Sequence, residues 1–276
     1  MGRFRPGMRV SDEFVRMIPE HLGWLARDFL SGGHPMQLVE QPSKYRRGNY
    51  RSYEDMSERT HADLERQIAS GFLEKLNYNP KIIHSQGGVF DAEKDKFRPV
   101  VDATRSGLNG CLQKMPCSYD MLRDLLKMLQ KGGYQAAFDL KDAFYLWPRA
   151  QVYCDYQGIQ GPGSSPEVFR YRYLPMGMSD SAGLQQSWAE AIKCVVNEEV
   201  LAPMCRKQLL GNGMESRLVE KASFSEIAAM YMDDGKVRCP ASFSWEQAVV
   251  QFGAVLEFFT KHGIDTAVGN ALNRNI

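Results

Sequence analysis

The sequence predicts an α+β fold in which antiparallel sheets pack against helices. Two pairs of apolar runs flank turn-like segments and are typical of β-hairpins: KIIHS and FRPVVDA stand on either side of DAEKDK, and YCDYQGIQ and VFRYRYL stand on either side of GPGSSPE. Helices and strands mix along the chain, and hairpins imply antiparallel pairing, so a doubly wound parallel sheet is not expected. The hydrophobic content of 43% and the charged content of 24% are ordinary for a globular chain of 276 residues.

The first 58 residues are interpreted as an N-terminal extension. Apolar residues from Phe14 to Leu30 recur at helical spacing. The run KYRRGNYR, from Lys44 to Arg51, mixes basic and aromatic side chains, which contact phosphates and stack on bases in nucleic-acid-binding proteins. A solvated loop is the alternative interpretation of this run.

Caps and periodicity predict the next elements. Thr60–Asp63 resembles a capping box, so we expect a helix there. One face of that helix would carry Leu64, Ile68, Phe72 and Leu76. The hairpin after Pro80 would have a basic tip. Ser118 is expected to cap a further helix that runs to Gln130 and stops at Gly132–Gly133.

The second half of the chain is expected to contain strands that end in carboxylates. AAFDL (residues 136–140) is a short apolar strand, and IAAMY and GKVRC are two strands joined by Met232–Asp234. A helix is predicted from Ser181 to Val196, and a loop insertion is predicted over 203–223. Ser244 with Gln247 would cap a last helix that ends near His262–Gly263.

Composition and targeting signals indicate an intracellular protein, in the cytoplasm or the nucleus. The chain has no run of about 18 apolar residues and no apolar segment behind its N-terminal charges, so neither a membrane span nor a secretory signal is expected. Six scattered cysteines without a C-x-x-C pair favour reduced, mostly buried thiols over a zinc site. A net charge of +1 gives no overall basic excess that would by itself indicate a nucleic-acid partner.

Three carboxylates carry the chemistry that the sequence suggests. Asp139 ends one apolar strand, and Asp233 and Asp234 occupy the turn of an apolar hairpin. Carboxylates beside buried strands are costly unless a cation compensates them, and hard oxygen ligands favour Mg²⁺ or Mn²⁺. Two such ions support phosphoryl transfer. An Asp-Asp-Gly sequence between strands is also an ordinary hairpin turn, and the turn alone does not decide between the two interpretations.

Four segments, taken in order, resemble reverse transcriptases of the retroviral and retrotransposon type. They are FRPVVDATRSGLN (97–109), FDLKDAFYLWPRA (138–150), RYLPMGMSDSAGLQQ (172–186) and YMDD (231–234). The resemblance covers roughly residues 60 to 265. It implies a right-hand polymerase fold, with fingers at 59–135 and a palm at 136–276. The antiparallel palm sheet would be backed by helices, a fingers hairpin would be inserted at about 150–174, and the thumb would be absent.

The resemblance also assigns the catalytic residues. Asp139, Asp233 and Asp234, with the backbone carbonyl of Leu140, would hold two Mg²⁺ ions, for which Mn²⁺ can substitute. The primer 3′-hydroxyl would attack the α-phosphate of a deoxynucleoside triphosphate, and pyrophosphate would leave. The enzyme would be an RNA-directed DNA polymerase, a nucleotidyltransferase.

Further residues would contact the nucleotide and the primer by the same resemblance. The nucleotide-binding residues would be Arg98, Lys96, Ala143, Phe144, Met176 and Gly177, and the primer and template residues would be Tyr231, Met232 and Pro175. Phe144 matches an aromatic steric gate that excludes a 2′-hydroxyl, and a core phenylalanine is the alternative. Gly177 would allow close backbone approach to a base or phosphate.

Some features depart from that family. Met176 stands where many retroviral enzymes have a glutamine, and GIDTAVGNALNR lacks the lysine expected in the next motif. The chain would belong to a longer polyprotein with a thumb, a nuclease H and an integrase or recombinase, or it would be a truncated copy. Its partners would be an RNA or DNA template with a primer. The alternatives are a catalytically silent remnant that binds nucleic acid and an RNA-dependent RNA polymerase, which generally has Gly-Asp-Asp at the turn.

Overall fold

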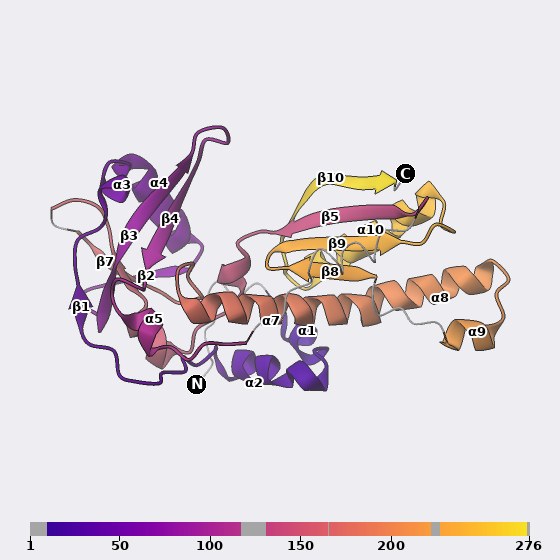
Figure 1. The fold of residues 1–276 in the computed structure, drawn as a ribbon, viewed down its shortest axis with the longest axis horizontal. Coiled ribbons are helices and arrows are strands. Elements are labelled where there is room, and N and C mark those ends of the chain that lie inside the picture. The colour runs from indigo at the N-terminus through magenta and orange to yellow at the C-terminus, as the bar shows by residue number, and fades with distance from the viewer. Residues whose placement is uncertain (1–9, 117–130, 165, 222–226, 275–276) are drawn as a thin grey trace. The chain divides into compact units, whose positions relative to one another are not determined.

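The computed structural model describes residues 10–116, 131–164, 166–221 and 227–274, with backbone alone for 221 and 268–274. The chain forms two compact units. Unit 1 contains residues 27–116 and 144–184, and unit 2 contains residues 10–26, 131–143 and 185–274, without the gaps just named. Each unit has a sheet with helices against it (Figure 1), so the predicted α+β class is confirmed.

Unit 1 is built on a six-stranded mixed sheet. The strands run in the order β1 (Tyr45–Arg46), β3 (Ile82–Asp91), β6 (Gly158–Gln160), β7 (Val168–Tyr171) and β2 (Leu73–Leu76), and β4 (Lys96–Asp102) pairs with β3. The β3–β4 and β6–β7 pairs are antiparallel, so both hairpins predicted from the sequence are confirmed. The pairs that β3 makes with β1 and β6 are parallel, which the sequence did not predict.

Short helices surround this sheet, and its core has two clusters. The helices are α3 (Arg51–Glu54), α4 (Ser57–Ala69), α5 (Leu108–Cys111), and the 3₁₀ segments η2 (Ala143–Leu146, which begins at the last residue of unit 2) and η3 (Gln151–Tyr156). Leu64 of α4 packs with Ile159 and Phe169 of the hairpin β6–β7. Ile82 of β3 packs in a second cluster with Leu108. Apolar burial from several parts of the sequence therefore holds unit 1 together.

The predicted capping box at Thr60–Asp63 is wrong. The helix α4 begins three residues earlier, at Ser57, and the Thr60 hydroxyl donates to the backbone oxygen of Tyr53 from inside the helix. The expected apolar face also stops early, because the helix ends at Ala69 and the chain then enters β2. Phe72 and Leu76 therefore lie beyond the helix, and Ile68 is 38% exposed.

Unit 2 is built on a four-stranded antiparallel sheet. Its order is β10 (Thr266–Arg274), β5 (Tyr134–Leu140), β9 (Asp234–Cys239) and β8 (Ala228–Tyr231). The predicted strands at 136–140 and on both sides of the Asp-Asp turn are confirmed. The strand β10 was not predicted, and it pairs along β5 with an irregularity between Val268 and Leu272.

Helix α10 (Trp245–Lys261) covers one face of this sheet. Its capping box at Ser244 and Gln247 is present, as predicted, and the ring of Phe259 lies 5.1 Å from the ring of Phe138 on β5. The short helix α1 (Asp12–Arg16) packs on the same helix, with 6.2 Å between the ring centroids of Phe14 and Phe258. The helix predicted over 181–196 is also confirmed as α7 (Ser179–Val196), whose first residues belong to unit 1 and whose remainder belongs to unit 2.

Two other predicted segments differ from the structure. The periodic stretch from Phe14 to Leu30 is divided into α1, the 3₁₀ turn η1 (Glu20–Leu22) and α2 (Gly23–Ser31), with Pro19 at the break, since proline interrupts helical hydrogen bonding. The described part of the predicted loop at 203–223 is mostly helical instead. A π-helical turn, η4 (Asn197–Leu201), leads into α8 (Ala202–Gly211), where Pro203 is tolerated in the first turn, and α9 (Ser216–Lys221) follows.

The predicted helix from Ser118 to Gln130 lies outside the described residues. Five cysteines fall in the described part of the chain, all as free thiols, and four of these are buried, as predicted. Burial raises the pKa of Cys154 to about 11 and that of Cys239 to about 12, so these thiols are un-ionised at neutral pH. No helix in the described ranges has both the length and the apolar character that a membrane crossing requires.

Candidate active site

Two of the three predicted catalytic aspartates face each other across a strand pair in unit 2. Asp139, one residue before the end of β5, is in register with Asp234, the first residue of β9. The next pair along is hydrogen-bonded, because the Leu140 N–H donates to the Asp233 carbonyl at 2.8 Å. Since hydrogen-bonded and open pairs alternate in antiparallel strands, Asp139 and Asp234 form an open pair, with Cα atoms about 4.5 Å apart and side chains close.

Both carboxylates belong to the more open face of the sheet. Burial alternates along β5, so Phe138 points into the core under α10 and Asp139 is on the opposite, partly exposed face. Asp234 is exposed, and Tyr231, its partner on β8, is 50% exposed. Lys236 is exposed two residues further along β9, on the same face. This face therefore presents two acids, a phenol and an ammonium group to solvent.

The turn between β8 and β9 has a strained backbone. Tyr231 pairs with Asp234, so Met232 and Asp233 form a two-residue loop, and Met232 has a φ of 57°. A positive φ at the first central residue, with Asp233 at negative φ, is the φ pattern of a type II′ turn, which normally has glycine there. Such a conformation in a non-glycine residue costs on the order of 1–3 kcal/mol and persists only where neighbours fix it.

Two adjacent glutamines of α7 fix this turn. The Met232 N–H donates to Gln186 Oε1 at 3.0 Å, and Gln185 Nε2 donates to the Met232 carbonyl at 3.1 Å. Both glutamines are buried. They are the last two residues of the segment 172–186, and no role was predicted for them from the sequence. A Gln-Gln pair at the buried side of a helix is the signal that identifies them, because a buried amide needs a polar partner.

Gly235 sets the close packing beneath the aspartates. A Cβ atom on this residue would lie 2.1 Å from Cζ of Phe138, its partner on β5. The Phe138 ring thus crosses directly over the Gly235 backbone. The Asp-Asp-Gly sequence therefore has a packing reason for its glycine, beyond the turn itself.

The carboxyl oxygens at this position suit a hard divalent cation. Like charges directly opposite each other destabilise a strand pair, so a cation between Asp139 and Asp234 would stabilise it. Asp233 follows Met232 in the same turn, and Leu140 is in register with it. In the described ranges, no three or more His, Cys, Asp or Glu side chains converge as a preformed metal-binding group.

The predicted nucleotide-binding residues Arg98 and Lys96 lie on β4 of unit 1. They share one face of the β3–β4 hairpin because they are two residues apart. Lys96 is exposed and Arg98 is partly exposed. Within the described part of the chain, the Arg98 side chain makes no hydrogen bond or ion pair that would occupy its guanidinium group.

Pro175, Met176 and Gly177 form a loop that packs on the same β4 strand. Gly177 has a φ of 106°, and a Cβ there would lie 1.9 Å from the Val101 carbonyl oxygen. Close approach to the protein's own backbone therefore accounts for this glycine, where the sequence interpretation invoked a base or a phosphate. Met176 is 37% exposed, and Pro175 is buried.

Asn109 holds this loop and was missed as a site residue. Its Nδ2 donates to the Gly177 carbonyl at 3.2 Å, and its Oδ1 accepts from the Ser179 N–H at 2.9 Å, where α7 begins. The structure thus brings the loop at 175–177 to the base of the hairpin that carries Arg98. One indication of this role was present in the sequence, because Asn109 is the last residue of the family-like segment 97–109.

Ala143 and Phe144 follow β5 in the segment η2. Asp142, which precedes them, has a φ of 52°, a left-handed conformation that aspartate tolerates better than most residues. Ala143 is buried, and Phe144 is partly exposed. Ala143 falls in unit 2 with the aspartates, whereas Phe144 is the first residue of the second segment of unit 1.

A scan against protein-family models and a search of curated proteins found no match to this chain.

Proposed function

We propose that the chain is the fingers-and-palm core of an RNA-directed DNA polymerase, encoded by a retroelement. The observation that carries this proposal is the open pair of Asp139 and Asp234 at one end of a solvent-facing sheet surface. Asp233 stands beside them in a turn whose strain is held by two buried glutamines. Strain that neighbours maintain is typical of functional sites.

In this proposal, the two facing carboxylates, with Asp233 and the Leu140 carbonyl, would hold two Mg²⁺ ions, for which Mn²⁺ can substitute. When bound, such ions would supply Lewis-acid activation of the attacking hydroxyl and stabilisation of the leaving oxygen. The primer 3′-oxygen forms a bond to the α-phosphorus of a deoxynucleoside triphosphate, and the α–β phosphoanhydride bond breaks to release pyrophosphate. The roles of the aspartates are to hold charge and to orient the reacting groups.

The residues of unit 1 would bind the nucleotide. Arg98 has a forked, permanently charged donor group that suits a triphosphate, and Lys96 adds a second cation on the same strand face. The loop at 175–177 would line the base, and Phe144 would exclude a 2′-hydroxyl. Tyr231 and Met232 would contact the primer terminus. The template would be RNA or DNA, and further domains of a polyprotein would hold the duplex.

Primer extension tests this proposal. The full chain is given an RNA template, a DNA primer, deoxynucleotides and either Mg²⁺ or Mn²⁺, alongside the variants Asp234→Asn and Asp55→Asn. Asp55 is an exposed carboxylate on the far end of α3 and serves as the matched control. We expect incorporation by the wild type and Asp55→Asn, with at least about a 100-fold loss in Asp234→Asn. Template-primer binding without incorporation would favour the silent-remnant alternative instead.

A further inference from the structure

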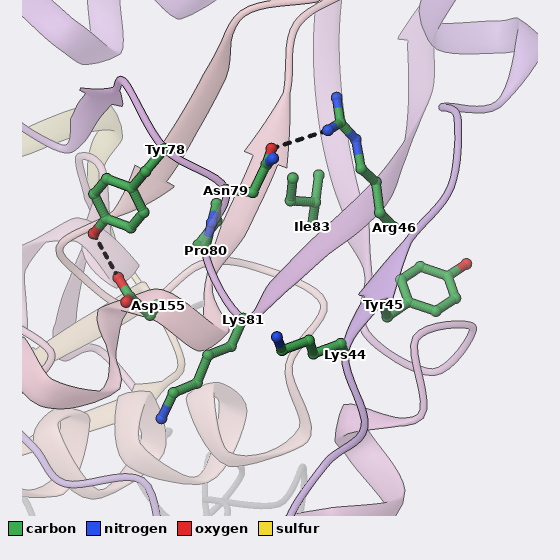
Figure 2. A pocket seen from close by; sticks show the side chains of 9 residues that line it. All are labelled: Lys44, Tyr45, Arg46, Tyr78, Asn79, Pro80, Lys81, Ile83 and Asp155. Atoms are coloured by element: carbon green, nitrogen blue, oxygen red, sulfur yellow. Dashed lines mark hydrogen bonds between the residues drawn. The ribbon is translucent and has the colours of Figure 1, made fainter.

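Unit 1 contains a cavity of about 560 Å³ whose lining includes none of the residues named above as catalytic or nucleotide-binding. It is formed where the two-residue strand β1 meets the segment that leads into β3 and the turn η3 (Figure 2). The lining residues are Lys44, Tyr45, Arg46, Tyr78, Asn79, Pro80, Lys81, Ile83 and Asp155. Its size is within the range of small-molecule and nucleotide sites, about 300–1,000 Å³.

The charge of this cavity is positive. Lys44, Arg46 and Lys81 contribute three cations, and Asp155 is the one carboxylate among the lining residues. The Asp155 carboxylate is already matched, because the guanidinium of the buried Arg170 forms an ion pair with it. Lys44 has no hydrogen bond or ion pair in the described part of the chain, and Figure 2 shows its ammonium group directed toward the main chain at Lys81. The cavity therefore has cationic capacity left for an anion.

An aromatic ring stands in the same cavity in a fixed orientation. Tyr78 is 45% exposed, and its hydroxyl donates to Asp155 Oδ1 at 2.9 Å and accepts from Arg170 Nη1 at 2.9 Å. Two hydrogen bonds at one end hold the ring in place without covering it. A held, exposed ring is a stacking surface for a base that loses little side-chain entropy on binding.

The other basic groups are held in a similar way. Arg46 Nη1 donates to Asn79 Oδ1 at 2.9 Å across the cavity edge, the bond drawn in Figure 2. Lys81 Nζ donates to the Tyr156 hydroxyl at 3.0 Å and lies 4.6 Å from the centre of that ring. Each of these bonds uses one N–H group, and an ammonium has three N–H donors and a guanidinium has five. Both side chains therefore keep N–H donors for a ligand.

The basic and aromatic character continues along the chain from this cavity. Arg47 and Arg51 are exposed, and Tyr50 is 38% exposed with the Arg105 guanidinium 4.7 Å from its ring centre. A mononucleotide would need the cavity alone. A polymer of phosphates and bases would also contact the basic and aromatic run beyond the cavity. The length of that run therefore favours a single strand of nucleic acid over a free nucleotide.

We infer that this cavity and the run from Lys44 to Arg51 bind single-stranded nucleic acid, with phosphates on Lys44, Arg46 and Lys81 and a base on Tyr78. This site goes beyond the proposed polymerase activity, because it uses none of the catalytic aspartates. It would bind a strand with or without divalent metal. The inference would make the basic run a binding segment, and a solvated loop is the alternative that the experiments below test.

Fluorescence anisotropy with a labelled 12-nucleotide single strand, in EDTA, tests the inference. The double variant Lys44→Gln/Lys81→Gln should bind more weakly, and its slope of log affinity against log salt should be shallower by about 1.4, from about 0.7 per phosphate contact. Lys207→Gln/Arg217→Gln, which removes two exposed cations from α8 and α9, is the matched control and should keep the wild-type slope. Equal slopes in the two double variants would overturn the site.

Tyrosine variants and competitors test the stacking and the ligand class. Tyr78→Ala should raise the Kd about 10-fold, whereas Tyr78→Phe, which keeps the ring, should change it much less. Equal affinity for a duplex, or displacement of the strand by ATP or phosphate at equal nucleotide concentration, would show that the ligand is not a single strand. Asp234→Asn should bind the strand as well as the wild type does, so failure here is distinct from failure of the polymerase proposal.

Discussion

Asp139 lies directly across a β-sheet pair from Asp234, and both carboxylates are on the face of the sheet that helix α10 does not cover. Like charges directly opposite each other destabilise a strand pair, so this position favours a bound cation. The neighbouring turn is strained at Met232, and two buried glutamines bind its backbone. The two facing carboxylates and the strained backbone at Met232 therefore lie at one end of the sheet, where the proposed chemistry would take place.

Gln186 is predicted to position the turn through its acceptor oxygen. Gln186→Met keeps the volume but leaves the Met232 N–H without its partner, an unmet bond that costs about 1–3 kcal/mol. We expect a lower kcat for nucleotide incorporation with little change in the KM for nucleotide. Gln208→Met on α8, which removes a glutamine that does not contact the turn, should behave like the wild type. A KM effect with unchanged kcat would contradict a positioning role.

Gly235 is predicted to be intolerant of a side chain. Gly235→Ala places a methyl group against the Phe138 ring, so the free energy of unfolding should fall by about 1–3 kcal/mol. Gly253→Ala is the control, since a Cβ there meets nothing within 4 Å in the middle of α10, and it should stabilise the fold by up to about 1 kcal/mol. Urea unfolding measures both. Equal stability of the two variants would show that Phe138 moves aside without cost.

His84 is predicted to make the fold sensitive to acid. Burial lowers the pKa of this fully buried imidazole from 6.5 to about 4, and the ring bonds the Tyr156 carbonyl through Nε2 at 2.8 Å. The unfolded chain takes up the proton more readily, so the stability that neutral His84 confers is complete above pH 6.5. It is lost as the pH falls toward 4, by about 3 kcal/mol. Urea midpoints measured from pH 7 to 4 should fall less steeply in His84→Gln than in the wild type. Identical pH profiles would rule out His84 as the cause.

Phe144 is predicted to select deoxynucleotides. Phe144→Ala should raise the incorporation of ribonucleotides relative to deoxynucleotides by at least about 10-fold, because the ring no longer fills the space of a 2′-hydroxyl. Phe90→Ala, which removes an exposed ring from β3, is the control and should leave the ratio unchanged. The ratio of kcat/KM values for the two sugars is the measurement. An unchanged ratio in an active Phe144→Ala enzyme would assign this residue to packing.

The sequence predicted the elements whose signals are local. The strands beside Asp139 and Asp234 are short apolar runs around a turn, and the start of α10 has a reciprocal cap at Ser244, so both were correct. The strand β10 has glycine and asparagine in its middle and gains its order from pairing with β5, a partner about 130 residues away in sequence. Periodicity within a window cannot show such pairing.

The predictions that were wrong also have identifiable physical causes. The periodic pattern that began at Leu64 was carried past the end of α4 into β2, because an apolar residue every four positions also fits a strand that follows a turn. The segment that begins at Pro203 was predicted to be a loop insertion, although proline is favoured in the first turn of a helix. Within the site, the aspartates were found from residue type, but Gln185, Gln186 and Asn109 act through backbone contacts that appear only in three dimensions.

Manganese binding tests the central claim most directly. Electron paramagnetic resonance counts bound Mn²⁺ in the full chain with a template-primer and a deoxynucleotide analogue that cannot be transferred. We expect the wild type and Asp55→Asn to bind Mn²⁺ alike. Asp139→Asn and Asp234→Asn should each bind it at least about 10-fold more weakly, with unfolding midpoints of the metal-free protein no lower than that of the wild type, since each change removes a like-charge repulsion. If both aspartate variants bind Mn²⁺ as tightly as the wild type, the facing carboxylates are not a metal centre.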